Sequence, residues 1–166
     1  MKIVGEKLSD WAVAEKDDGH VDLFGRSAFN RYYYSTFLIT RELLRSLDPK
    51  WGTAAHKNIP EILRDSLKKK IKYKLASAKK NKLITESQAS QILTQATNAI
   101  SELSSLLESS YSIRVTADYE PETRVETRSR HITLENTTLE AANKWPDRAA
   151  MHCKTIYRAC QEIGLA

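Results

Sequence analysis

Apolar residues recur at intervals of three and four along most of the 166-residue chain, the spacing that places them on one face of a helix. The pattern predicts an all-α fold, a single up-and-down bundle in which residues 1–166 form one domain. The helices are expected at residues 4–17, 22–47, 59–79, 85–118 and 139–163. The second and fourth of them are expected to form the centre of the bundle.

Local signals indicate where some of these helices begin. Thr85-x-x-Gln88 and Thr137-x-x-Glu140 have the spacing of a capping box, in which two side chains satisfy free N–H groups at a helix start. We therefore expect helices to start at both places. Pro146 is expected to kink or restart the last helix, because proline lacks the N–H that a helix interior needs.

Residues 120–136 interrupt the helical pattern. The segment contains three arginines, Arg124, Arg128 and Arg130, and loops of this length inside a small domain are often functional. Apolar and polar residues alternate at Val125, Thr127, Ile132 and Leu134, which allows a short β excursion.

Two predicted helices carry charge on faces that are otherwise apolar. The second helix brings Asn30, Arg31 and Tyr33 toward the core, and the apolar face of the fourth helix continues to Arg114 and Asp118. A buried polar group without a partner costs roughly 1–3 kcal/mol, and a buried charge costs far more. We therefore expect Asp118 to form a buried salt bridge with Arg31 or Arg114.

Three segments form a set in chain order: NRYYYSTF at 30–37 followed by RELL at 41–44, AHKNI at 55–59, and RVTADYEP at 114–121. They resemble the S-R-A-Y-Y-A-x-F-x-x-x-R-x-L-L, T-H-x-G-V and R-x-x-A-D-Y-D-P motifs of the HEPN superfamily, and 139–141 is similar to the start of its last helix. The resemblance covers about residues 20–165. It implies an all-α protein of a toxin–antitoxin or anti-phage defence module that acts on RNA, as a homodimer or with a cognate antitoxin or defence partner.

The resemblance groups seven polar residues from these segments: Arg31, Tyr33, Tyr34, His56, Arg114, Asp118 and Tyr119. In one interpretation they form a pocket that holds phosphate or a nucleotide. In the other they form a buried charge network that fixes helix packing, with tyrosine hydroxyls completing the hydrogen bonds. The structural interpretation is preferred, because the resemblance places these residues at family positions whether or not a member is catalytic. His56 is expected to fix its loop.

Charge is concentrated in one stretch of the chain. The 26 Lys and Arg exceed the 21 Asp and Glu, for a net charge of +5, and residues 68–82 contain eight lysines. Such a cluster indicates a nucleic-acid patch, formed by Lys68, Lys69, Lys72, Lys79 and Lys80. The alternative is a solvated helix face whose lysines favour the helix dipole and keep the protein soluble.

The sequence has no metal-binding or cofactor-binding motif, and we expect neither a metal nor a cofactor. The resemblance implies metal-independent RNA cleavage by an R-x(4–6)-H pair, in which Arg steadies the phosphate and His moves a proton. Arg124 and His131 fit this spacing but lie in the 120–136 segment. Arg148 and His152 have only three residues between them, yet they lie one turn apart on the last helix and are the preferred catalytic pair.

Three function classes remain open: a ribonuclease toxin or defence effector, a module that binds nucleic acid or a nucleotide, and a scaffold subunit. No apolar run approaches the ~20 residues of a membrane span, and residues 1–20 lack the core of a signal peptide. Cys153 and Cys160 are too far apart on one helix to form a disulfide with each other. We expect a cytoplasmic protein with reduced thiols.

Overall fold

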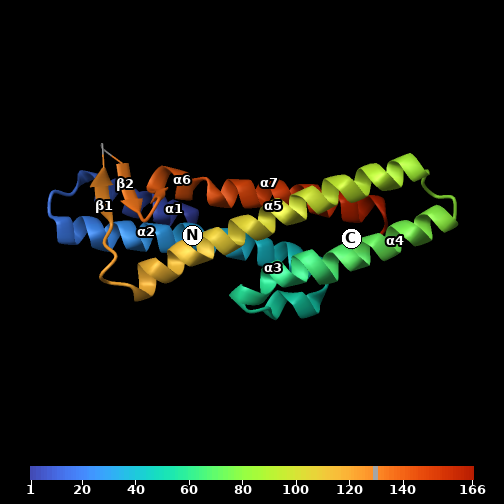
Figure 1. Ribbon diagram of the computed structural model, residues 1–166, viewed down its shortest axis with the longest axis horizontal. Coiled ribbons are helices and arrows are strands. Elements are labelled where there is room, and N and C mark those ends of the chain that lie inside the picture. The colour runs from blue at the N-terminus through green and yellow to red at the C-terminus, as the bar shows by residue number, and fades with distance from the viewer. Residues whose placement is uncertain (129–130) are drawn as a thin grey trace. The chain divides into compact units, whose positions relative to one another are not determined.

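The computed structural model describes residues 1–128 and 131–166 (Figure 1). Arg130 lies outside the described residues, and only the backbone of Arg128 is described. Within the described part of the chain the fold is all-α, as predicted, with five helices of 13 residues or more. These are α1 (Lys2–Ala14), α2 (Asp18–Leu47), α4 (Lys68–Lys80), α5 (Glu86–Tyr119) and α7 (Trp145–Glu162).

Short elements connect the long helices. They are η1 (Pro49–Thr53), η2 (His56–Asn58), α3 (Ile59–Glu61), η3 (Ile62–Leu67), β1 (Glu126–Arg128), β2 (His131–Leu134), β3 (Thr137–Thr138) and α6 (Leu139–Asn143). η3 is a π-helical segment between α3 and α4, so the helix predicted over 59–79 has the right extent and a wider turn inside it.

Capping side chains explain where α2 and α5 begin. The predicted start of α2 is wrong by four residues, because the Asp17 carboxylate accepts a hydrogen bond from the His20 backbone N–H at 2.9 Å and caps a helix that starts at Asp18. The capping box before α5 is confirmed. The Gln88 backbone N–H donates to Thr85 Oγ1 at 3.2 Å, and the Thr85 N–H donates to Gln88 Oε1 at 2.8 Å.

The second predicted capping box is wrong by one residue. Thr137 belongs to β3, and Thr138 is the residue that caps α6, with its hydroxyl accepting from the Ala141 backbone N–H at 3.1 Å. Pro146 acts as predicted. α6 ends at Asn143, and α7 starts again at Trp145 with Pro146 in its first turn, where the missing N–H is harmless.

The chain forms two compact units. Unit 1 comprises Met1–Leu38 and Leu107–Arg148, and unit 2 comprises Ile39–Leu106 and Ala149–Ala166. α2, α5 and α7 each contribute residues to both units. The single domain expected from the sequence stays a prediction.

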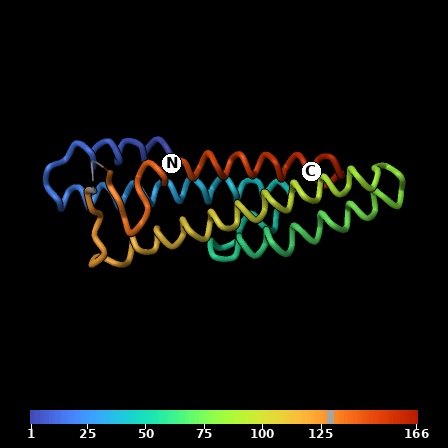
Figure 2. The backbone as a smooth tube through the Cα atoms, turned by 45° about the horizontal axis from the view of Figure 1, so that its top comes forward, coloured from blue at the N-terminus to red at the C-terminus, as the bar shows by residue number. Residues whose placement is uncertain are grey.

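In unit 1, α1 lies along the N-terminal part of α2 (Figure 2). Gly5 permits this close approach, because a Cβ at that position would lie 2.7 Å from Cε1 of the buried Tyr32 ring. Gly25 has the same role against Val125, whose Cγ1 would lie 2.9 Å from an added Cβ. Both glycines therefore stand where a side chain would separate α2 from its neighbours.

The 120–136 segment of unit 1 contains the β excursion that its alternation allows. β1, β2 and β3 are antiparallel and lie in that order, with Thr127 opposite Ile132 and Leu134 opposite Thr137. The excursion includes a third strand, the two-residue β3. Val125, Ile132 and Leu134 are buried, which explains why the segment folds onto the unit.

In unit 2, α4 and the N-terminal part of α5 run antiparallel (Figure 1). Their facing sides supply large, fully buried aliphatic side chains. These include Ile71 in α4 and Ile100 and Leu103 in α5. Leu67 at the end of η3, Leu44 in α2 and Ile156 in α7 are equally buried. Burial of such side chains stabilises a domain by about 1.5–3 kcal/mol each.

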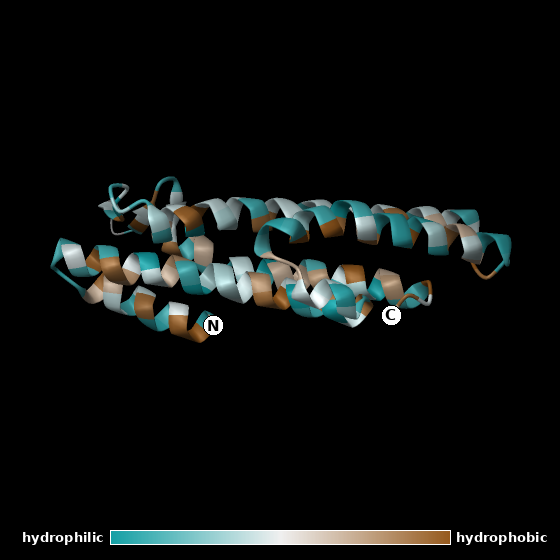
Figure 3. Cartoon of the chain, turned by 90° about the horizontal axis from the view of Figure 1, so that it is seen from below, coloured by the Kyte–Doolittle hydropathy of each residue, from teal (hydrophilic) through white to brown (hydrophobic). Residues whose placement is uncertain are grey.

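The long helices are amphipathic, with hydrophobic and hydrophilic residues on each (Figure 3). Among the described residues, no helix combines the length and the hydrophobicity that crossing a membrane requires.

Candidate nucleic-acid interface

The predicted salt bridge of Asp118 is present, and its partner is Arg114 of the same helix. Asp118 Oδ2 lies 2.8 Å from Nη2 of Arg114, and the Asn30 side-chain amide donates to Oδ1 at 2.5 Å. The two charged side chains are only 14% and 22% exposed. Arg31, the other expected partner, forms no such contact with Asp118. The residues that meet here come from α2 and from the end of α5.

Aromatic side chains enclose the Arg114 guanidinium. Its central carbon lies 5.9 Å from the centre of the Tyr34 ring and 5.2 Å from that of Tyr119. Burial lowers the pKa of Arg114, but hydrogen bonds to Tyr119 and Tyr34 and the Asp118 charge outweigh burial and raise it. Tyr33 is fully buried behind Tyr34, and burial raises its pKa.

This cluster fits a structural role better than phosphate binding. The Arg114 charge is already balanced by Asp118, and the rings cover the guanidinium. Two buried atoms at this place, Arg114 Nε and Asn30 Oδ1, have no hydrogen-bond partner. Arg31 is half-buried and takes no part in the network, and His56 lies in η2, which belongs to unit 2. Within unit 1, the structure brings together Tyr33, Tyr34, Arg114, Asp118 and Tyr119.

Arg26 is the charged residue of unit 1 that sequence reasoning missed. Its Nε donates to both carboxylate oxygens of Asp22 at 3.0 Å, and its two terminal nitrogens donate to main-chain carbonyls at and beyond the end of α5. These carbonyls belong to Thr116, Ala117, Glu120, Pro121 and Thr123. A helix leaves its last carbonyls unsatisfied, so Arg26 caps α5 from another helix.

A second contact completes the Arg26 cap. Asp22 Oδ1 also accepts a hydrogen bond from the Val125 backbone N–H at 2.8 Å. The Asp22–Arg26 pair therefore fixes both the end of α5 and the chain that leaves it. The only signal in the sequence is that Arg26 lies at helical spacing from Asn30, Tyr33 and Phe37, on the face that α2 turns toward the core.

The two candidate catalytic pairs differ in their surroundings. Arg124 is exposed, and His131 begins β2 with its Nδ1 3.1 Å from Glu140 Oε1. This contact gives His131 a structural partner on α6. Arg148 and His152 lie one turn apart on α7; Arg148 is exposed and His152 is half-buried. Their joint action stays a prediction.

The described residues contain no cluster of three or more His, Cys, Asp or Glu side chains that could hold a metal ion. Cys153 and Cys160 are buried free thiols, and burial raises the pKa of Cys153 to about 12 and that of Cys160 to about 11. Thiols with such pKa values are not nucleophiles at neutral pH, because the thiolate is the reactive form.

The lysines of α4 separate into two groups. Three of them have partners within unit 2. The Nζ atom of Lys70 lies 3.1 Å from Asp48 Oδ2 and 4.9 Å from the centre of the Trp51 ring. Lys74 Nζ donates to the Gly164 carbonyl, and Lys79 Nζ lies 2.9 Å from Glu86 Oε1. In the described part of the chain, Lys68, Lys69, Lys72 and Lys80 form no salt bridge or side-chain hydrogen bond.

The unpaired lysines share one face of the helix, which we call the α4 lysine face: Lys68, Lys69, Lys72 and Lys80. Their spacing of three, four and eight residues brings them to one side. Tyr73 adjoins this face with 74% of its surface exposed. At one end, Lys68, Lys69 and Lys72 line a hollow of 370 Å³ together with Arg64 and Asp65. Four of the five lysines of the predicted patch are therefore available to a ligand, and Lys79 is the exception.

Comparison of the chain with protein-family models, with curated proteins and with solved structures finds no match. The chemistry of the side chains is therefore the basis for assigning a function.

Proposed function

We propose that the protein binds the phosphate backbone of RNA through the α4 lysine face, as an RNA-directed protein of HEPN type. The observation that carries the proposal is the set of four unpaired lysines on one helix face, of which Lys69, Lys72 and Lys80 are exposed and Lys68 is half-buried. Lys70 and Lys79 are paired with carboxylates, whereas these four lysines are both unpaired and gathered on one helix face. Lysines without such partners attract phosphate, and release of counterions from the nucleic acid drives the binding.

Tyr73 supports the choice of a nucleic acid over a free anion. Its ring is exposed beside the lysine face and has no aromatic neighbour in the described contacts. A base that stacks on an exposed tyrosine contributes about 1–3 kcal/mol, while lysines hold the adjacent phosphates. Tyr73→Ala should therefore weaken RNA binding about tenfold, and Tyr73→Phe, which keeps the ring, should not.

The resemblance to HEPN proteins points to RNA, and unit 1 supports the resemblance. Two of the quoted motifs lie more than 80 residues apart in the chain, yet Asn30 and Tyr34 from the first contact Asp118 and Arg114 from the second. A homodimer or a cognate antitoxin or defence partner stays a prediction, and sedimentation of the purified protein tests the homodimer.

The test is the salt dependence of binding to a labelled single-stranded RNA, measured by fluorescence anisotropy. The triple variant Lys68→Ala, Lys69→Ala, Lys72→Ala should lose at least about tenfold in affinity. The slope of log K against log salt should fall by about 2, because each phosphate contact to a single strand contributes about 0.7. A matched control removes three exposed lysines elsewhere: Lys16, Lys57 and Lys144.

Two outcomes would overturn the proposal: no binding of RNA by the unaltered protein, or equal losses in the triple variant and its control. DNA of the same sequence, run in parallel, tests the preference for RNA. The same samples, incubated in EDTA and run on a gel, test cleavage. His152→Ala should abolish any cleavage if the Arg148–His152 pair is catalytic, and full activity in this variant would exclude His152 as the general acid or base.

A further inference from the structure

The exposed face of α5 in unit 2 lacks charge over about four turns. Residues 87–101 contain no Asp, Glu, Lys or Arg. Their exposed positions carry hydroxyl or amide side chains: Ser87, Gln88, Ser90, Gln91, Thr94, Gln95, Asn98 and Ser101. Solvent-facing helix surfaces are usually rich in charged residues, so a face composed of hydrogen-bonding but neutral groups indicates a contact surface.

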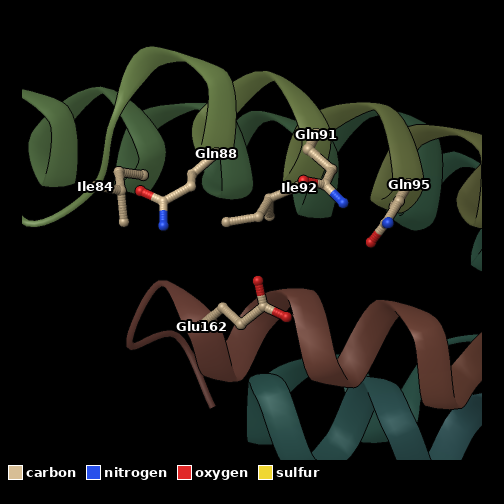
Figure 4. A pocket seen from close by; sticks show the side chains of 6 residues that line it. All are labelled: Ile84, Gln88, Gln91, Ile92, Gln95 and Glu162. Atoms are coloured by element: carbon tan, nitrogen blue, oxygen red, sulfur yellow. The ribbon is translucent and has the colours of Figure 1, made fainter.

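One end of this face forms a groove with α7. Six residues line a cavity of 510 Å³: Ile84 from the connection before α5, Gln88, Gln91, Ile92 and Gln95 from the start of α5, and Glu162 from the end of α7. Figure 4 shows the glutamine side chains extending from α5 toward α7 and the Glu162 carboxylate extending toward them. All six residues belong to unit 2. The volume lies within the range of about 300–1,000 Å³ that is usual for small-ligand sites.

The polar groups of the groove are open to a ligand. Gln88 Oε1 accepts from the backbone N–H and the hydroxyl of Thr85, which leaves the amide NH2 as a donor. In the described part of the chain, Gln91, Gln95 and Glu162 form no side-chain hydrogen bond or salt bridge. The groove therefore offers amide donors and acceptors opposite one carboxylate, beside aliphatic surface from Ile84 and Ile92.

This combination suits the edge of a nucleobase. Glutamine can bond adenine through both a donor and an acceptor, and a carboxylate accepts from the exocyclic amine of cytosine or adenine. The aliphatic side chains can contact the flat faces of the ring. Phosphate is disfavoured here, because Glu162 would repel it and the groove lining contains no cation.

The groove is continuous with the α4 lysine face through two further hollows. The first, of 480 Å³, shares Gln91 and Gln95 with the groove, and extends along α5 to Glu86 and Ser90. The second, of 200 Å³, includes Glu86 and Ser90 and reaches Lys72 on α4. A strand that passes around half of α5, whose diameter is about 10–12 Å, follows a path of roughly 16–19 Å, on the order of five nucleotides at ~3.4 Å each.

We infer that the groove between Gln91, Gln95 and Glu162 holds an unpaired adenine or cytosine of a single-stranded RNA whose backbone crosses from the α4 lysine face. The inference rests on the proposed function and adds to it a class of substrate: single strands with an amine-bearing base at one position. A base in a duplex would have its edge already paired and could not enter.

The first experiment uses nucleosides, which carry no phosphate and are indifferent to the lysines. Adenosine, cytidine and uridine are titrated into the full chain, and the side-chain amide signals of glutamine are followed by NMR. Adenosine and cytidine should shift the signals of Gln91 and Gln95, with uridine at least about fivefold weaker. No shift with any nucleoside would overturn the inference, whatever the protein does with RNA.

The second experiment compares oligo(A), oligo(C) and oligo(U) RNA. Glu162→Gln and the double variant Gln91→Ala, Gln95→Ala should each reduce the preference for oligo(A) or oligo(C) over oligo(U) about tenfold, and leave the salt slope unchanged. The matched control is Gln161→Ala, an exposed glutamine of α7 outside the groove lining. Glu162→Gln should not weaken binding to oligo(U), because it removes a negative charge.

The outcomes separate the two proposals. If all variants keep the same preference for oligo(A) or oligo(C) over oligo(U), and the salt slope still depends on the lysines, the groove is not a base-binding site. The proposal that the α4 lysine face binds RNA would then be unaffected. Nucleoside shifts at Gln91 and Gln95 without RNA binding would overturn the proposed function and support the groove as a nucleobase site.

Discussion

Unit 1 and unit 2 both contain positively charged side chains on long helices, but these side chains differ in burial and in whether a carboxylate pairs with them. In unit 1, Arg26 and Arg114 are 13% and 14% exposed, and each has a carboxylate partner one turn away in the same helix. In unit 2, Lys68, Lys69 and Lys72 lie on the solvent face of α4 and have no carboxylate partner in the described part of the chain.

The contrast separates charge that is satisfied within the fold from charge that the proposed function assigns to RNA. A guanidinium can satisfy several acceptors in a fixed geometry, and this suits the five carbonyls that Arg26 contacts. An ammonium on a flexible stem suits phosphates whose positions vary. The predictions below test this division by removing charge from each unit in turn, and they begin with the largest expected effect.

Arg26→Ala should reduce the free energy of unfolding by about 3–5 kcal/mol, the usual cost of removing one partner from a buried ion pair. The substitution leaves the Asp22 carboxylate without its cation and the carbonyls at the end of α5 without donors. Urea unfolding followed by circular dichroism measures the effect. Arg45→Ala is the matched control on α2, because the Arg45–Glu42 pair is exposed, and it should change little. Equal effects would show that Arg26 does not cap α5.

Asp118→Ala should cost about 1.5–3 kcal/mol, the usual contribution of hydrogen bonds to a charged group. The effect is smaller than that of Arg26→Ala, because Asp118 contacts two side chains whereas Arg26 also satisfies five main-chain carbonyls. The Tyr34 and Tyr119 rings also still cover Arg114 in the variant. Arg31→Ala should have almost no effect, because Arg31 is not the partner of Asp118. Thermal unfolding of both variants decides this. A strong loss for Arg31→Ala would contradict the assignment.

Much of the fold is accessible from the sequence because burial follows helical spacing. Ile92, Ala96, Ile100, Leu103 and Leu107 recur at that spacing and are all buried in α5. The charges at the end of the same line, Arg114 and Asp118, could be predicted to pair because a buried charge needs a partner. The lysines of residues 68–80 could be predicted to form a nucleic-acid patch, because their spacing places several of them on one face of α4.

Other features, such as the Arg26 cap and the groove, depend on contacts between residues far apart in the chain, and the local sequence does not indicate them. Arg26 binds main-chain carbonyls about 90 residues away, and every residue type supplies the same carbonyl. Asp17 could have been recognised as a cap, but the Gly19 that follows it is more typical of a turn. The groove needs Glu162 from the end of the chain beside Gln91, which only tertiary structure provides.

Glu140→Gln should lower stability by less than about 1 kcal/mol at neutral pH, because both Glu140 and His131 are more than half exposed. Burial raises the pKa of Glu140, but hydrogen bonds from its own backbone N–H, from His131 and from Thr138 outweigh burial and lower the pKa below 4.5. The folded state therefore binds its proton more weakly than the unfolded state does.

The sign of the pH dependence follows from this lowered pKa. The contribution of Glu140 is fully present above the unfolded value of 4.5, and it is lost as the pH falls through the lower folded pKa. The difference between the protein and Glu140→Gln, measured by urea unfolding from pH 7 downward, should shrink in this window. Glu122→Gln, an exposed acid of the same unit, is the control and should show no such change.

Removal of Lys68, Lys69 and Lys72 together should have the smallest effect on stability and the opposite sign. Lys68 and Lys72 are four residues apart and Lys69 and Lys72 are three apart, so like charges repel along the helix at a cost of about 0.2–0.5 kcal/mol for each pair. Alanine also has the highest helix propensity. The triple alanine variant should therefore be as stable as the unaltered protein or more stable by about 0.5 kcal/mol, while its affinity for RNA falls at least about tenfold. If the lysines belonged instead to the architecture of unit 2, as the arginines belong to that of unit 1, the variant would lose stability and keep whatever affinity it has. Urea unfolding and RNA titration of the same preparation distinguish these two cases.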